Sequence, residues 1–157
     1  AGWRFLDMGR RAERAINTVR FARQFGYDEA TPEDLDILLT LVDCQITYRS
    51  RYLIGPSLAP IRDLVVLDLY NPRSVAFQIE VLNDHMPLLK EDGLIERPQR
   101  LAVSLRARLT AAEAAHLDGR TLFALEQDLL SLSEAIGQHY FPHGPNASRP
   151  EKLTGLA

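Results

Sequence analysis

The opening of the chain places an acidic residue among arginines within a segment whose spacing predicts a helix. Glu13 lies three residues after Arg10 and four residues before Asn17, so these three polar side chains share one strip of an α-helix. Arg14, the next residue, points about 100° away from Glu13 on an ideal helix. A carboxylate beside guanidiniums can belong to a structural ion network or to a binding site for an anion.

Further arginines follow at Arg49, Arg51 and Arg73, on segments that the spacing assigns to other helices. If these helices pack with their polar strips inward, several guanidiniums converge on the Glu13 carboxylate. Such a cluster could bind a carboxylate or a phosphate through bidentate hydrogen bonds, or it could be a structural network that ties three helices together. The sequence leaves both interpretations open.

The turn from Asn71 to Ser74 precedes another predicted helix. Asn71 is a suitable N-cap residue, and the first backbone N–H groups of that helix could also face an anion. Gln78, one turn after Ser74, would extend either arrangement. Helix capping is the simpler interpretation, with Arg73 as a donor at the surface or to a neighbouring helix.

Other residues that could do chemistry lack the necessary companions. Glu113 and His116 have the Glu-x-x-His spacing of di-iron helical bundles, but the sequence contains no second copy of that pattern. Cys44 has apolar or acidic neighbours and no histidine close in sequence, so we interpret it as a small buried thiol. We interpret His85 as an exposed residue at a helix end. No metal or cofactor is predicted.

Composition limits the class of protein and its partners. The 157 residues suffice for one domain with a core, and 46% hydrophobic and 25% charged residues are ordinary for a globular protein. A net charge of −3 gives no reason to expect nucleic acid or an anionic membrane as a partner. The single cysteine allows no internal disulfide and favours a reducing, cytoplasmic compartment. The sequence contains no apolar run of about 18 residues, so no membrane span is predicted.

Apolar periodicity and turn residues predict an all-α protein, a helical bundle of about five to six helices over residues 1–141. Residues 142–157, rich in Pro, Gly, Asn and Ser, are expected to form an irregular tail. Because the chain begins inside a helical pattern without an initiator Met, we expect a fragment of a longer protein. The expected helices span residues 2–25, 32–53, 61–70 (where a buried strand is the alternative), 75–86, 98–117 and 121–140.

Three segments carry a resemblance to a known family. Residues 9–15 read Gly-Arg-x-x-Glu-Arg-Ala, residues 46–53 read Ile-Thr-Tyr-Arg-x-Arg-Tyr-Leu, and residues 67–78 read Leu-Asp-x-x-Asn-Pro-Arg-Ser-x-x-x-Gln. In this order they resemble the bacterial Alpha-E family, a helical domain with a Glu-Arg motif. Ala12 departs from the bulkier apolar residue usual there, which leaves the motif itself intact.

The resemblance implies a place in a larger system. Members of that family carry an earlier half with a similar helix, so this chain would correspond to the second half. They are characteristically encoded beside ATP-grasp and transglutaminase-like proteins, which implies a role in making, modifying or cutting peptide or amide bonds. The resemblance supplies no established reaction for the helical domain.

Two functions follow as hypotheses. The first is a non-enzymatic helical partner or scaffold that contacts an ATP-grasp or transglutaminase-like protein and its own missing N-terminal half. The second is an enzyme or a binder of a small anionic ligand that uses the Glu13 and arginine cluster. A former interface left exposed by the missing half would also favour a homo-oligomer.

Overall fold

The structure, a computed structural model, describes residues 2–89 and 96–140. Within these residues it contains seven α-helices and no strand, which confirms the all-α fold with slightly more helices than expected. The expected tail at 142–157 and most of the expected loop at 90–97 lie outside the described residues. The α-helices are α1 Gly2–Phe25, α2 Pro32–Leu41, α3 Gln45–Arg51, α4 Leu58–Arg62, α5 Val75–His85, α6 Arg97–Ala111 and α7 Gly119–Tyr140.

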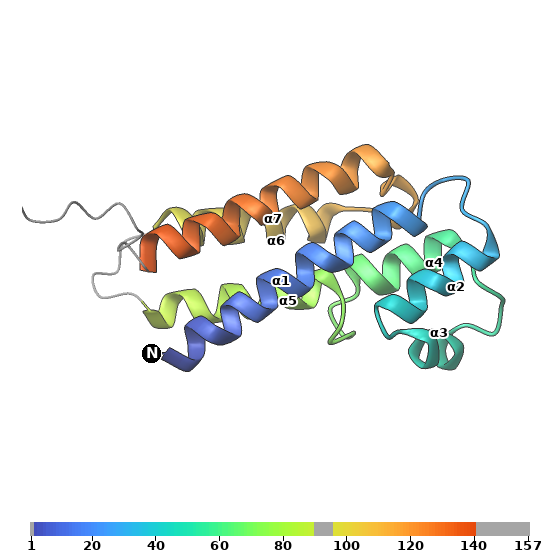
Figure 1. Ribbon diagram of the computed structural model, residues 1–157, viewed down its shortest axis with the longest axis horizontal. Coiled ribbons are helices and arrows are strands. Elements are labelled where there is room, and N and C mark those ends of the chain that lie inside the picture. Colours follow the sequence, from blue (N-terminus) through green and yellow to red (C-terminus); the bar gives the residue numbers. More distant parts are fainter. Residues whose placement is uncertain (1, 90–95, 141–157) are drawn as a thin grey trace, which may run out of the picture.

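Four of these helices form the bundle (Figure 1). Helix α1 packs against α5 and α7, and α6 packs against the same two helices from the other side. The shorter helices α2, α3 and α4 gather around the C-terminal end of α1 (Figure 1). None of the helices within the described ranges has the length and apolar character needed to cross a bilayer.

Helix α1 has the bounds that the sequence predicts. Its buried stripe includes Met8, Ala12, Ala15, Val19 and Ala22, at the three- and four-residue spacing of one helix face. Since three of these five side chains are alanines, the backbones of α5 and α7 can approach α1 closely. The stripe thereby leaves the opposite face of α1 free for polar residues.

Gly26 ends α1 for a reason other than the left-handed conformation that its type suggests. A Cβ on Gly26 would lie 2.7 Å from the Ala22 carbonyl oxygen and 3.1 Å from a methyl of Leu38, so a larger residue does not fit. The Gly26 carbonyl accepts a hydrogen bond from buried Arg62 at 3.1 Å, and Arg62 also pairs with Asp28 at 2.9 Å. The end of α1 is thus held to α4.

The predicted second helix begins as expected and then breaks. Thr31 caps α2 in a capping box with Asp34, but the helix stops at Leu41 instead of continuing to Leu53. Asp43 takes a φ of 54°, which no Gly or Pro in the sequence announces. The break lets Cys44 become buried at the start of α3.

The apolar segment expected at 61–70 is helical from Ile61 to Leu67 and ends in a turn, so it is not the buried strand that was the alternative. After α4, residues Asp63–Leu67 form a π-helix, in which the Asp68 N–H donates to the Asp63 carbonyl at 2.9 Å. Leu64, Val65 and Val66 are all fully buried in this turn. Two 3-10 helices, Met86–Leu89 and Ala114–His116, complete the described elements, and the second replaces the expected last turns of the 98–117 helix.

A buried carboxylate joins α1 to α7. Glu126 on α7 has only 5% of its side chain exposed, and its two oxygens pair with Arg20 at 2.6 Å and with Arg23 at 3.0 Å. Arg23 also lies over the ring of Phe123, 5.0 Å from its centroid. A carboxylate held by two guanidiniums is therefore present in the bundle, at Glu126.

We expect Glu126→Gln to lower the free energy of unfolding by about 1.5–3 kcal/mol, since hydrogen bonds to charged groups contribute roughly that much. Urea denaturation measures the loss. The matched control is Glu134→Gln on the same helix, because Glu134 is exposed and is bonded to Gln138 alone. Its expected change is within about 0.5 kcal/mol. Equal denaturation midpoints for the two variants would contradict the role of Glu126.

Candidate functional site: an arginine-lined cleft on α1

A cleft lies where α1 faces the α2–α3 turn and the loop before α5. Its volume is about 690 Å³. Five of the residues predicted from the sequence line it, together with Asp43 and several less polar side chains. The lining consists of Arg10, Glu13, Arg14, Asn17, Thr18, Phe21, Leu41, Val42, Asp43, Pro72 and Arg73.

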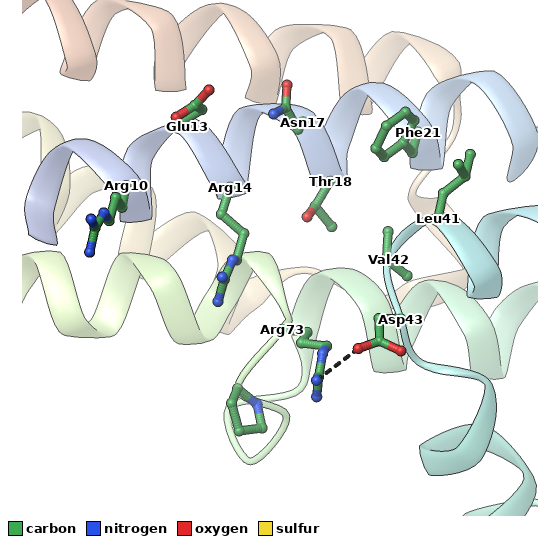
Figure 2. Close-up of a pocket in the computed structure, with 11 residues that line it drawn as sticks. Arg10, Glu13, Arg14, Asn17, Thr18, Phe21, Leu41, Val42, Asp43 and Arg73 are labelled. Carbon is green, nitrogen blue, oxygen red and sulfur yellow. Dashed lines mark ion pairs between the residues drawn. The ribbon is translucent and has the colours of Figure 1, made fainter.

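Two guanidiniums on α1 are available to a ligand in this cleft. Figure 2 shows Arg10 and Arg14 directed to the side of α1 on which Arg73 and Asp43 lie. Both arginines are exposed, and neither makes a hydrogen bond or an ion pair with any described residue. Guanidiniums without a protein partner can bind carboxylate or phosphate in the forked geometry that suits those groups.

Glu13 does not gather guanidiniums as expected. It is exposed and makes no ion pair or hydrogen bond within the described part of the chain. In Figure 2 its side chain, like that of Asn17, points away from the side to which Arg10 and Arg14 point. The arginines of α1 that pair with a buried carboxylate are Arg20 and Arg23, which reach Glu126 about two to three turns beyond Glu13.

Asp43 is the cleft residue that sequence analysis missed, because it was placed inside a continuous helix. Its φ of 54° lies in the left-handed region, which costs a non-glycine residue on the order of 1–2 kcal/mol. Its carboxylate pairs with Arg73 at 2.8 Å. The side chain of Asp43 is 72% exposed and that of Arg73 is 47% exposed. Since exposed pairs contribute little, an anionic ligand can displace Asp43 from Arg73 at low cost.

The remaining predicted arginines lie elsewhere. Arg51 pairs with Asp68, and Arg49 is exposed on α3 and does not line the cleft. The reason is the break before α3, which separates these residues from the strip that a continuous helix would have continued. The structure therefore brings only Arg73 of the three to the cleft.

Asn71 is buried and is not the helix cap. Its side-chain amide donates to the Leu64 carbonyl at 2.9 Å and lies 3.4 Å from the Cys44 sulfur. The cap of α5 is Ser74, whose hydroxyl oxygen accepts from the Phe77 N–H at 3.0 Å. Asn71 instead closes the turn after the π-helix. Burial raises the pKa of the Cys44 thiol, in keeping with the small buried thiol expected there.

Gln78 is buried and connects Pro72, which lines the cleft, to α1. Its amide donates to the Pro72 carbonyl at 2.7 Å, and its carbonyl oxygen accepts from Arg11 at 3.2 Å. Arg11 in turn pairs with Asp7, four residues earlier on α1, at 3.4 Å. The spacing of Asp7 and Arg11 was the available sequence signal for this network.

His85 is half-buried rather than exposed, because it completes the same network from the end of α5. Its Nε2 lies 2.8 Å from the Asp7 carboxylate. The rings of Trp3 and His85 pack edge-on, with their centroids 5.7 Å apart. Burial by itself would raise the pKa of Asp7. The hydrogen bonds from His85 and Arg11 and their charges outweigh burial and hold that pKa below its usual value.

The fold and the cleft define the class of protein: an all-α bundle with an arginine-lined cleft on its first helix. The chain belongs to the Alpha-E family, described as a predicted alpha-helical domain with a conserved ER motif, whose model matches residues 1–141. Within that range, Glu13-Arg14 is the pair that sequence analysis assigns to the motif.

Similar relatives are uncharacterised proteins of Mycobacterium bovis and Mycobacterium tuberculosis. Each is 28% identical over 139 residues, which cover 86% of this chain and 16% of the relative. The chain thus spans about a sixth of the length of these relatives. No solved structure matches it.

The Asp7 network predicts a sign for the acid dependence of stability. Because the pKa of Asp7 is lowered on folding, its contribution is present above the ordinary carboxyl pKa and is lost as pH falls through the folded value. We therefore expect Asp7→Asn to lower the melting temperature at pH 7. The difference from the wild type should shrink below about pH 4. Thermal melts followed by circular dichroism between pH 2 and 7 test this, and a difference independent of pH would contradict it.

Proposed function

We propose that this chain is a helical binding module in an assembly that joins or modifies peptide or amide bonds, where it contacts an ATP-grasp or transglutaminase-like protein. Its membership of the Alpha-E family supports this proposal through the resemblance described above. The observation that carries it is a concentration of exposed apolar side chains on and just after α3.

Ile46, Leu53 and Ile54, three aliphatic residues within nine positions, are 80%, 100% and 59% exposed. Surface apolar groups concentrated in this way mark protein-contact sites. Helix α3 lies at the outer edge of the molecule, away from the four-helix bundle (Figure 1). A partner can therefore reach this surface without disturbing the core.

The loop that carries Leu53 and Ile54 is held in place. The buried Tyr48 hydroxyl donates to the Gly55 carbonyl at 2.9 Å and accepts from the Ser57 N–H at 3.2 Å. The Tyr48 ring also stacks on Tyr52, with centroids 4.8 Å apart. A surface that is ordered before binding loses less entropy when it meets its partner.

We expect the double variant Ile46→Ser/Leu53→Ser to weaken capture of the neighbouring ATP-grasp protein about tenfold or more, as loss of two apolar contacts at an interface would. The measurement is a pull-down with the full-length protein, quantified by titration. Val103→Ser, on the exposed face of α6, is the matched control and should bind as the wild type does. Failure of the wild type to capture either the ATP-grasp or the transglutaminase-like neighbour would contradict the proposal.

A second function, binding of an anionic group in the cleft, is favoured by Arg10 and Arg14, which make no hydrogen bond or ion pair with any residue that the structure describes. The ligand would carry a carboxylate or a phosphate, and Arg73 would exchange its exposed pair with Asp43 for the ligand. Such a group is compatible with substrates of peptide ligation, which present carboxylates and phosphates. No catalytic role for a cleft residue is needed in this proposal.

We expect Arg10→Gln/Arg14→Gln to weaken binding of succinate or inorganic phosphate about tenfold, because each forked contact to an anion is charge-assisted. Chemical-shift titration of the backbone amides measures the affinity. Arg49→Gln, which removes an exposed arginine outside the cleft, is the control and should have no effect.

Glu13→Gln distinguishes this function from a structural role of the motif. Because Glu13 is exposed and has no partner in the described residues, the variant should keep the wild-type melting temperature and should not weaken anion binding. A large loss of stability would identify Glu13 as a structural residue. Equal binding of succinate by the double arginine variant and the wild type would contradict the anion site.

A further inference from the structure

The wall of the cleft on α1 contains a buried hydroxyl. Thr18 is only 4% exposed, and its hydroxyl makes no hydrogen bond with any residue that the structure describes. The exposed hydroxyls of Thr40, Ser50 and Thr110 differ, since each donates to the carbonyl of the residue four positions earlier. Buried polar groups in proteins nearly always have a hydrogen-bond partner. The Thr18 hydroxyl is therefore a group to which a molecule in the cleft can bond.

Thr18 lies next to the cationic part of the cleft. Figure 2 shows its side chain directed to the same side of α1 as that of Arg14, where Arg73 also lies. Arg14 precedes Thr18 by about one helical turn, a rise of about 6 Å. Long guanidinium side chains and a hydroxyl at this spacing can reach the two oxygens of one carboxylate. The hydroxyl thus adds a directed, uncharged donor to the anion site proposed above.

The other end of the cleft is apolar. Phe21, Leu41 and Val42 line it, and Figure 2 places Phe21 and Leu41 away from Arg10. Leu41 is 45% exposed and Phe21 is partly exposed, so an aliphatic group that covers them removes apolar area from water. Phe21 follows Thr18 by three residues, about 4.5 Å along the helix axis. A ligand the size of one amino-acid residue can therefore reach both.

Asp43 supplies a hydrogen-bond acceptor in the same cleft. Its carboxylate pairs with Arg73 at 2.8 Å, and both side chains are well exposed. A ligand carboxylate that takes Arg73 leaves Asp43 able to accept a hydrogen bond from an N–H group. Because that bond is charge-assisted, it compensates Asp43 for the lost ion pair. The cleft therefore offers donors for a carboxylate, an acceptor for an N–H group and an apolar wall.

We propose that the cleft binds the C-terminal residue of a peptide whose last side chain is apolar. The peptide carboxylate lies between Arg14 and Arg73 and accepts a hydrogen bond from the Thr18 hydroxyl. The amide N–H of the same residue donates to Asp43, and its side chain packs against Leu41. This assignment rests on the anion site proposed above and narrows its ligand, and it does not involve the exposed apolar residues of α3.

The test compares N-acetyl-L-leucine, a minimal peptide terminus, with three compounds that each lack one group. N-acetylglycine lacks the apolar side chain, N-acetyl-L-leucinamide lacks the carboxylate, and 4-methylpentanoate lacks the amide. Chemical-shift titrations of the wild type, followed at the backbone amides of Thr18 and Val42, measure the affinities. N-acetyl-L-leucine should bind about tenfold more tightly than N-acetylglycine and 4-methylpentanoate. N-acetyl-L-leucinamide should produce no saturable shift, because it has no charge for the guanidiniums.

Thr18→Val should weaken binding of N-acetyl-L-leucine about tenfold, because the change removes a hydrogen bond to a charged group. Valine keeps the shape of threonine, and no hydrogen bond to a described residue is lost. The variant should therefore melt at or above the temperature of the wild type. Thr110→Val on α6 is the matched control, because Thr110 does not line the cleft, and it should bind as the wild type does.

A second pair of variants tests the apolar end of the cleft. Leu41→Ser should lower the affinity for N-acetyl-L-leucine towards that for N-acetylglycine, while the affinity for N-acetylglycine itself should not change. Ile37→Ser is the matched control, because Ile37 lies one turn earlier on α2 and does not line the cleft. The exposed fractions of the two residues are similar, 43% for Ile37 and 45% for Leu41. The control should bind both compounds as the wild type does.

Three results would overturn the peptide assignment and leave the anion site standing. One is equal affinity for N-acetyl-L-leucine and N-acetylglycine, which would make the cleft a general anion site. Another is equal affinity for N-acetyl-L-leucine and 4-methylpentanoate, which would make the ligand an apolar carboxylate without a peptide group. The third is unchanged binding in Thr18→Val. Failure of the wild type to bind succinate, phosphate and N-acetyl-L-leucine alike would instead remove the anion site, and the peptide assignment with it.

Discussion

The pairing of Glu126 with Arg20 and Arg23 fixes how α1 lies in the bundle, and the rest of the molecule is arranged around α1. A buried carboxylate must keep its cationic partners, because losing them would leave an uncompensated charge out of water. This requirement sets both the rotation of α1 about its axis and its position along α7. The polar residues of the opposite face, including Arg10 and Arg14, consequently point outward in a fixed direction.

A second polar network fixes the other flank of α1. Asp7 and Arg11 reach His85 and Gln78 on α5, and Gln78 holds the Pro72 carbonyl of the loop that borders the cleft. With both flanks engaged, the cleft occupies the side of α1 that no bundle helix covers. The groups that could bind a ligand are thus those that the two structural networks leave unused.

The fold followed from the sequence where the signals were local. The bounds of α1 and the capping box of Thr31 depend on residues within one or two turns, and both were predicted. The break at Asp43, where φ is 54°, was not predicted, because no Gly or Pro marks it. The acid that gathers arginines was assigned to Glu13 rather than to Glu126, since a pair separated by 106 residues leaves no periodic signal.

The π-helix also has a consequence for how this chain tolerates length changes. Deleting one residue from 63–67 would allow an ordinary α-helical turn and would rotate the preceding segment by about 100°. Arg62 would then swing away from the Gly26 carbonyl, which anchors the end of α1. The extra residue in the wide turn therefore keeps Arg62 in contact with the Gly26 carbonyl. We expect insertions and deletions among relatives to occur in surface loops and not in this stretch.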